Sequence, residues 1–291
     1  TQTTLNAANA VISNNVGRKS KSLWTDNGEG EKVNYTLYEN GYDEAEGVAS
    51  GIAEYVRDGW NYNDVAILYR TNAQSRALEE KLMIHNIPYK IYGGQNFYQR
   101  KEIKDILAYL KTIDNGLDGQ AVKRIINVPK RGIGNTTIDR LQEYADFNDI
   151  TFWEALVNAK DIDTIKNAAL SKLEPFVDLI GRLRAKEEFM SLKELAEAVI
   201  EDTGYIESLS QNETVEEVEA RRENLDEFIN KVVSYEESCK EAGEEPTLSG
   251  LLEEVALIAD IDNLDESEPH VMLMTLHSAK GLEFPIVYMT G

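Results

Sequence analysis

Short apolar runs alternate with helical patterns in the first third of the chain. Residues 64–70 (DVAILYR) form a compact apolar run, and a helical pattern follows over residues 72–85. Residues 32–38 (KVNYTLY) and 87–92 (IPYKIY) alternate apolar and polar side chains, and a helix is expected over residues 43–58. Strands that alternate with helices predict an α/β layer with a mostly parallel sheet.

The pattern changes to a helical period in the middle of the chain and returns to β character at its end. From residue 100 to about residue 261 nearly every segment repeats its apolar positions with the helical period, including one long charged helix over residues 215–241. Residues 271–276 (VMLMTL) and 285–289 (PIVYM) read as strands, but a stretch of roughly 20 residues cannot bury a core of its own. We therefore expect a partial α/β sheet domain that is interrupted by a large all-helical insertion.

The negative charge of the chain is concentrated in the helical segment. The net charge is −22, and residues 141–270 contain 34 acidic and 11 basic residues, while the rest of the chain contains 18 acidic and 19 basic ones. Residues 95–131 contain eight basic residues against four acidic ones. This stretch is the expected phosphate-facing region, although a solvated helix face would have the same composition.

The sequence gives no sign of a membrane-spanning segment, a metal site or an internal disulfide. There is no apolar run of roughly 18 residues, and the single cysteine, Cys239, has no cysteine partner within the chain. The three histidines are not spaced as metal ligands. We expect a cytoplasmic protein with no metal site in this chain.

Two segments have the residue types that bind phosphate. The loop after the strand over residues 271–276 contains polar side chains, and the carboxyl edge of an open α/β sheet is where ligands bind. Residues 128–137 (VPKRGIGNTT) place glycines at a tight turn before a helix, where free backbone N–H groups attract anions. Lys130 and Arg131 add charge, and Thr136 or Thr137 could cap the helix and bind phosphate. Taken alone, each segment could also be an ordinary polar turn.

Four segments, in order along the chain, resemble motifs of the UvrD/PcrA family of superfamily 1 DNA helicases. AILYRTNAQSR (66–76) resembles motif IV, YGGQNFYQRKEIKDILAYL (92–110) motif IVa, INVPKRGIG (126–134) the duplex-contacting GIG element, and TLHSAKGLEFPIV (275–287) motif V. The resemblance covers nearly the whole chain. It implies an ATP-dependent 3′-to-5′ DNA helicase of DNA repair and replication.

The same resemblance implies a division into domains. Residues 1–24 would be the end of a first motor domain and its hinge. Residues 25–110 and 271–291 would form an incomplete second RecA-like motor domain. Residues 111–270 would be an inserted helical accessory domain that binds duplex DNA.

The resemblance also implies a nucleotide site. Arg70 would be the catalytic arginine that reaches across the interdomain cleft to the γ-phosphate of ATP, because its guanidinium offers bidentate hydrogen bonds to phosphate. Tyr69 would pack near the adenine, and Gly281 and Glu283 would meet the ribose.

DNA contacts are implied for three of the motifs. Thr275 and His277 would touch the backbone of the single strand, and so would Phe97, Tyr98 and Arg100, with packing at a helix start as the alternative role for Phe97. The duplex would be bound by Lys130, Arg131, Gly132, Ile133, Gly134, Thr136 and Thr137.

The sequence lacks G-x-x-x-x-G-K-[ST] and an acidic Mg²⁺-binding box. ATP and Mg²⁺ are therefore expected as cofactors of the full-length enzyme, and this chain is expected to be a fragment, ending after motif V, that does not hydrolyse ATP alone. Its expected partners are single-stranded DNA, junctions of single-stranded and duplex DNA, and the first motor domain, while protein partners are unknown. The alternatives are a subunit of a recombination helicase–nuclease and a non-enzymatic DNA-binding or protein-interaction module.

Overall fold

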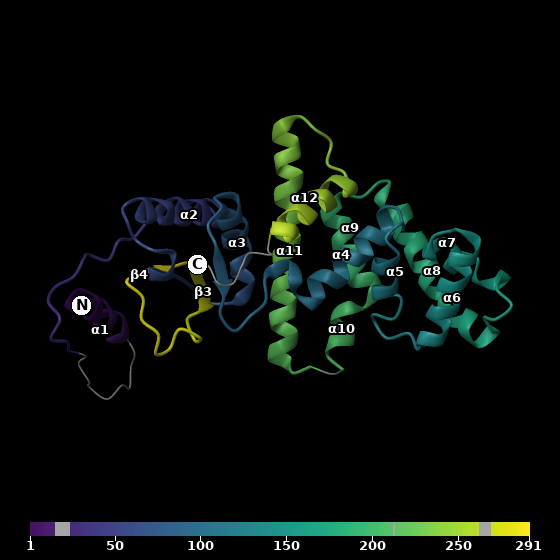
Figure 1. The fold of residues 1–291 in the computed structure, drawn as a ribbon, viewed down its shortest axis with the longest axis horizontal. Helices are drawn as coiled ribbons and strands as arrows, with labels where there is room; N and C mark the ends of the chain where they lie inside the picture. Colours follow the sequence, from purple (N-terminus) through teal and green to yellow (C-terminus); the bar gives the residue numbers. More distant parts are fainter. Residues whose placement is uncertain (15–23, 212, 262–268) are drawn as a thin grey trace. The chain divides into compact units, whose positions relative to one another are not determined.

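The computed structural model describes residues 1–14, 24–211, 213–261 and 269–291, which form two compact units, Thr1–Glu44 and Ala45–Gly291 (Figure 1). The first unit contains helix α1 (Gln2–Ile12) and a segment without regular secondary structure. The two are joined by a hydrogen bond from the backbone N–H of Gln2 to the carbonyl of Gly28, at 3.2 Å.

The strand predicted over residues 32–38 is absent from the structure. This segment has no regular secondary structure, and Val33, Tyr35 and Leu37 are all exposed. Alternation of apolar and polar side chains stabilises a strand only where a neighbouring strand and a buried face exist, and this segment has neither.

The second unit contains a four-stranded parallel sheet. The strands are β1 (Val65–Tyr69), β2 (Tyr89–Ile91), β3 (Val271–Thr275) and β4 (Ile286–Met289), in the spatial order β2-β3-β1-β4. Every adjacent pair is parallel. The first and last parts of the chain thus share one sheet, which confirms the predicted α/β fold with a helical insertion.

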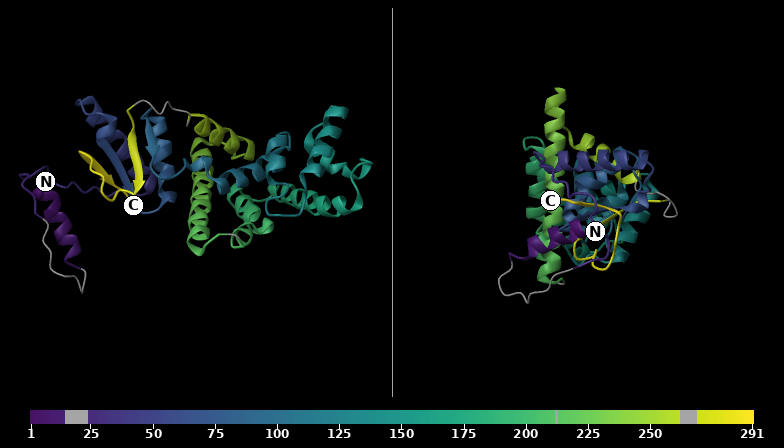
Figure 2. Two further views of the ribbon diagram at one scale, coloured as in Figure 1. Left: turned by 60° about the horizontal axis from the view of Figure 1, so that its bottom comes forward. Right: turned by 90° about the vertical axis from the view of Figure 1, so that its left-hand side faces the viewer.

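One face of the sheet is covered by two helices, α2 (Gly41–Arg57) and α3 (Ser75–Ile84), which lie alongside the strands in Figure 2. Alternate β1 side chains, from Val65 to Tyr69, are wholly buried on that face. Because successive side chains of a strand point to opposite faces, the remaining β1 side chains point to the other face of the sheet. At the sheet margin Met289 of β4 is 72% exposed.

The insertion is helical throughout, as predicted. Its α-helices are α4 (Lys101–Asp114), α5 (Gly119–Ile125), α6 (Asn135–Asn148), α7 (Phe152–Val157), α8 (Asn167–Glu187), α9 (Leu192–Thr203), α10 (Tyr205–Leu209), α11 (Val215–Ala242) and α12 (Leu248–Ile261). The described residues also contain the short 3₁₀ turns η1 (Tyr62–Asp64), η2 (Asn72–Gln74), η3 (Phe97–Gln99) and η4 (Ala159–Asp161).

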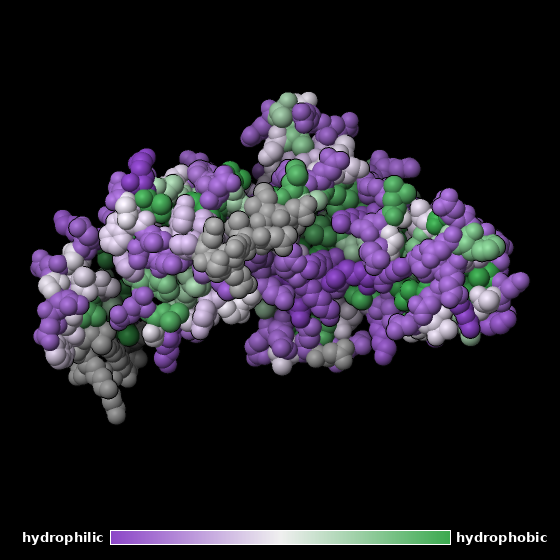
Figure 3. Space-filling model, viewed as in Figure 1, coloured by the Kyte–Doolittle hydropathy of each residue, from purple (hydrophilic) through white to green (hydrophobic). Residues whose placement is uncertain are grey.

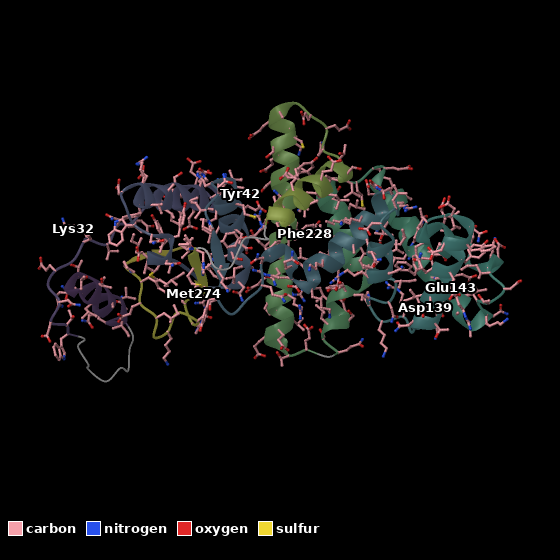
Figure 4. The ribbon with its side chains drawn as sticks, viewed as in Figure 1. Lys32, Tyr42, Asp139, Glu143, Phe228 and Met274 are labelled. Atoms are coloured by element: carbon pink, nitrogen blue, oxygen red, sulfur yellow. The ribbon has the colours of Figure 1, made fainter. Side chains whose placement is uncertain are left out.

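The helices enclose a second apolar core that is separate from the core of the sheet. Phe176 of α8 and Phe228 of α11 are fully buried there. Figure 4 labels Phe228 on α11. Helix α11 starts with a capping box in which Thr214 and Glu217 bond to each other's backbone, and it ends at Gly243 in the left-handed conformation. It runs past η2 and α4 and so connects the sheet to the helical core.

The outer surface of the helical block is largely hydrophilic on the face shown in Figure 3. Asp139 and Glu143 on α6, which Figure 4 labels, belong to this exposed surface. Among the described residues, no helix has both the length and the apolar character needed to cross a membrane.

Candidate functional site

The sheet brings motifs IV and V to one edge. Tyr69, at the end of β1, pairs in parallel register with Thr275, at the end of β3, and the N–H of Leu276 donates to the Tyr69 carbonyl at 2.8 Å. Parallel strands end at the same edge, so the loops that follow both strands emerge together. Arg70 and the loop that starts at Leu276 are therefore neighbours.

Arg70 projects from a turn that Gln74 holds in place. The Gln74 Oε1 atom accepts hydrogen bonds from the N–H groups of Arg70, at 2.9 Å, and Thr71, at 3.1 Å. The Arg70 side chain is exposed, and its guanidinium makes no hydrogen bond or ion pair with any residue that the structure describes. It is thus free to bind an anion.

A groove of about 1130 Å³ opens at this edge of the sheet. Arg70, Arg100, Lys101, Thr275 and His277 line this groove. It is also lined by Glu102 and by the first half of α11, which contributes Glu216, Glu217, Glu219 and Glu223 together with Arg221. A polyanion in this groove would be attracted by Arg70 and Lys101 and repelled by the glutamates of α11.

The motif V loop is held by its own hydroxyl groups. The Thr275 and Ser278 hydroxyls are 2.9 Å apart, and the Ser278 N–H donates to Thr275 Oγ1 at 3.2 Å. Gly281 has a φ of +88°, and no atom lies within 4 Å of the position where a Cβ would be. Glu283 is exposed, and neither Gly281 nor Glu283 lines the groove. The expected DNA contacts and ribose contacts of this loop therefore lie on different parts of it.

Tyr69 is fully buried in the core of the sheet. Burial, together with the nearby carboxylate of Glu79, raises the pKa of its hydroxyl well above the ordinary value. The expected packing of Tyr69 against adenine stays a prediction, and in this structure its ring packs against protein.

The motif IVa residues are packed inside the protein. Phe97 is fully buried, and Tyr98, which is 4% exposed, donates its hydroxyl to Glu80 Oε1 at 2.6 Å. The Arg100 guanidinium donates to Asn224 Oδ1 at 2.7 Å and to Ser75 Oγ at 2.8 Å. These contacts favour the packing role at the start of α4, and DNA contact by these residues stays a prediction.

Arg100 also lies in a desolvated position. Its burial lowers the pKa of the guanidinium, and the neighbouring carboxylate of Glu79 opposes that shift. The guanidinium lies 5.0 Å from the centre of the Phe97 ring, within cation–π range. Arg100 therefore joins α3, α4 and α11 and contributes part of its surface to the groove.

In the GIG element, Arg131 is engaged with the protein. Its guanidinium donates to the carbonyl of Ile125 at 2.9 Å and to the Tyr109 hydroxyl at 2.7 Å, and it lies over the Phe176 ring at 4.9 Å. Lys130 is exposed. Lys130 is thus the freer of the two expected cations.

Several N–H groups of the GIG loop are available to a ligand. Asn127 Oδ1 accepts from the N–H groups of Arg131, at 2.8 Å, and Ile133, at 3.2 Å. Four backbone N–H groups here have no protein acceptor in the described part of the chain: those of Gly132, Gly134, Asn135 and Thr136. Gly132 has a φ of +73°, and Asn135 and Thr136 are the first two residues of α6. The helix begins at Asn135 with Gly134 as its N-cap, so the expected cap by Thr136 or Thr137 is wrong.

Lys172 is a candidate that the sequence pattern did not reveal. It lies on α8, and its ammonium donates to the carbonyl of Gly132 at 2.8 Å. A lysine beside a glycine-rich turn is recognised in sequence only when both are close along the chain, and here forty residues separate them. The fold adds a second cation next to the free N–H groups.

Some acidic side chains of the helical block are held in ion pairs and hydrogen bonds inside the protein. Asp105 is 1% exposed and accepts from Arg124 Nε and from the Tyr205 hydroxyl, each at 2.7 Å. Arg76 contacts Glu227 at 2.8 Å, which links α3 to α11. Among the described residues, no group of three or more His, Cys, Asp or Glu side chains is placed to hold a metal ion.

Known proteins are similar to this chain over its whole length. The family model of the UvrD-like helicase C-terminal domain matches residues 1–291. The chain is similar to the ATP-dependent DNA helicases PcrA of Staphylococcus aureus, at 47% identity, and Staphylococcus epidermidis, at 45% identity. All of this chain is covered in both cases, but only 39% of each relative. The chain therefore belongs to the UvrD-like helicase C-terminal domain family.

Proposed function

We propose that this chain is the part of an ATP-dependent 3′-to-5′ DNA helicase that contacts the γ-phosphate of ATP and the DNA. The observation that carries the proposal is the pairing of Tyr69 with Thr275, because it sets the free guanidinium of Arg70 beside the motif V loop at one edge of the sheet. One edge would then meet nucleotide and DNA together, which is what coupling of hydrolysis to movement needs.

Arg70 is proposed to act on the nucleotide. An exposed guanidinium on a braced turn can approach a γ-phosphate that another domain holds and can stabilise the charge that develops during phosphoryl transfer. Gly281 and Glu283 are proposed ribose contacts. The described residues do not fit a Mg²⁺ site, so no step is assigned to a metal here, and hydrolysis is proposed to need parts of a longer protein.

The single strand is proposed to lie in the groove beside Thr275, His277 and Lys101. The glutamates of α11 that line the same groove support this path, because their repulsion disfavours a phosphate backbone close to that helix. The duplex is proposed to contact the GIG loop through the free N–H groups after Gly132 and through Lys130 and Lys172, which would read backbone and not sequence.

The biological setting is part of the proposal. The PcrA proteins are named as ATP-dependent DNA helicases. We propose roles in DNA repair and replication, at junctions of single-stranded and duplex DNA in the cytoplasm.

Site-specific photo-cross-linking tests the proposed path. A 3′-tailed duplex would carry a photoreactive base either in its tail or in its duplex, and cross-linked peptides would be mapped by mass spectrometry. Tail cross-links are expected around His277 and Lys101, and duplex cross-links within residues 128–137 and at Lys172. Cross-links spread over the acidic helices, or equal in both substrates, would refute the proposal.

A further inference from the structure

A second groove follows helix α12, away from the edge of the sheet. It consists of two adjoining hollows of about 540 Å³ and 380 Å³ that share Lys111, Asp118, Leu252 and Ala256. The hollows extend along α12 from Ser249 to Ala256, which is about two helical turns. In Figure 3 hydrophobic colour gathers beside α12.

The floor of this α12 groove is aliphatic. It is lined by Leu107 and Ala108 of α4, Ala121 of α5 and Val255 of α12, each of which is itself at most 9% exposed. The apolar surface that a partner could cover lies at the half-buried Leu252, the exposed Ala256 and Leu117, which borders the second hollow and is 69% exposed, although leucine gains free energy from burial.

Its two ends have opposite charge. Lys104, Lys123 and Arg124 surround the first hollow, and the amine of Lys104 makes no hydrogen bond or ion pair with the described residues. Asp114 and Glu253 border the second hollow. The cationic end is unusual in a chain with a net charge of −22, most of it contributed by the helical segment.

We propose that the α12 groove binds an amphipathic helix of another protein, with its carboxylates at the Lys104 end and its cations at the Glu253 end. An apolar stripe at i, i+3 or i+4 and i+7 spans two turns, which matches the length of the floor. A helix with acidic residues in its first half and basic residues in its second half is also favoured by its own dipole. The pattern of charge therefore specifies the orientation of the partner.

A nucleic acid fits this groove less well. Binding of unpaired bases relies on exposed aromatic rings, and the aromatic residue that lines the groove, Tyr98, is 4% exposed with its hydroxyl bonded to Glu80. The acidic second hollow also repels phosphate. The proposal is independent of the DNA contacts at the edge of the sheet.

A fluorescent peptide of about 15 residues tests the proposal by anisotropy. It would have a leucine stripe, glutamates in its first half and lysines in its second, and a control peptide of the same composition would have its leucines scattered around the helix. The protein variants are Ala256→Trp, which fills the groove from an exposed position, and the double variant Lys104→Glu/Lys123→Glu. Lys160→Glu changes an exposed lysine outside the groove and is the matched control.

We expect the striped peptide to bind the unmodified protein saturably. Both groove variants should weaken this binding at least tenfold, and Lys160→Glu should leave it unchanged. Circular dichroism would verify that each variant is folded. No saturable binding to the unmodified protein at about 100 µM, or equal binding to the Ala256→Trp protein, would overturn the proposal. Displacement of the peptide by a thymidine oligonucleotide would overturn it in favour of a nucleic-acid ligand.

Discussion

Tyr69 and Thr275 pair across β1 and β3, although most of the chain lies between them. The residues that follow them, Arg70 and the motif V loop, are the proposed contacts for nucleotide and DNA. Helices α4 to α12 leave the sheet after β2 and return before β3, and the first half of α11 lines the groove at this edge.

Replacement of Arg70 should affect chemistry and not folding. In the longer helicase that we propose, Arg70→Ala should lower the ATP turnover number by about 10³-fold, because the charge on the transferred phosphoryl group loses its partner. The melting temperature of the chain should change little, since the guanidinium has no partner in the described structure. Steady-state ATPase assays and thermal melting measure the two effects. Unchanged turnover would show that Arg70 does not reach the nucleotide.

Lys172 should contribute to duplex binding. Lys172→Glu should weaken binding to a blunt duplex and reduce the slope of log affinity against log salt concentration by about 1, because one phosphate contact is lost. Lys193→Glu, on α9, is the control and should change neither. Equal duplex affinities of the Lys172→Glu and Lys193→Glu proteins would remove Lys172 from the interface.

Arg131 should stabilise the fold more than Lys130 does. Arg131→Met removes hydrogen bonds to the Ile125 carbonyl and to Tyr109, and it should lower the free energy of unfolding by about 1–3 kcal/mol. Lys130→Met, at the exposed neighbour, should stay within about 0.5 kcal/mol of the unmodified protein. Urea denaturation measures both. If the two variants are equally stable, the Arg131 contacts have no structural role.

The stabilisation of three helices by their N-terminal capping boxes should depend on pH. Hydrogen bonds lower the pKa values of the capping glutamates Glu154, Glu194 and Glu217. The larger effect comes from the backbone N–H groups of Thr151, Ser191 and Thr214, and the smaller one from the hydroxyls of the same three residues. Because these pKa values are lower in the folded state, the caps stabilise the helices fully above the unfolded pKa of about 4.3 and lose this effect as pH falls through the folded values.

NMR titration of the glutamate carboxyl groups measures this effect. Glu154, Glu194 and Glu217 should each titrate below the ordinary glutamate pKa of about 4.3. Titration of all three at that ordinary value would show that the capping boxes do not form in solution.

The strands and helices could be predicted where local pattern and long-range partners agree. β1 and β3 are apolar runs, and both become central strands, because buried parallel strands need apolar side chains on both faces. The charged helix predicted over residues 215–241 corresponds to α11, whose capping box and terminal glycine are local signals. Residues 32–38 had the alternation of a strand without a neighbour to pair with.

The candidate site could be predicted only in part. Adjacency of Arg70 and Thr275 follows from motif order and parallel topology. Burial of Phe97 and Arg100 does not, because their partners, among them Asn224 on α11, are distant in sequence. Lys172 was overlooked for the same reason, since its partner Gly132 lies on another helix–turn unit.

The most direct test of the proposed DNA site is a fluorescence anisotropy titration of a 3′-tailed duplex across a salt series. It would compare the unmodified chain with Lys130→Glu/Lys172→Glu and with Gly132→Val, a substitution at a left-handed position. Binding should weaken steeply with salt and should be largely lost in both variants. Binding that is absent at low ionic strength, or equal in all three proteins, would contradict the proposed DNA site.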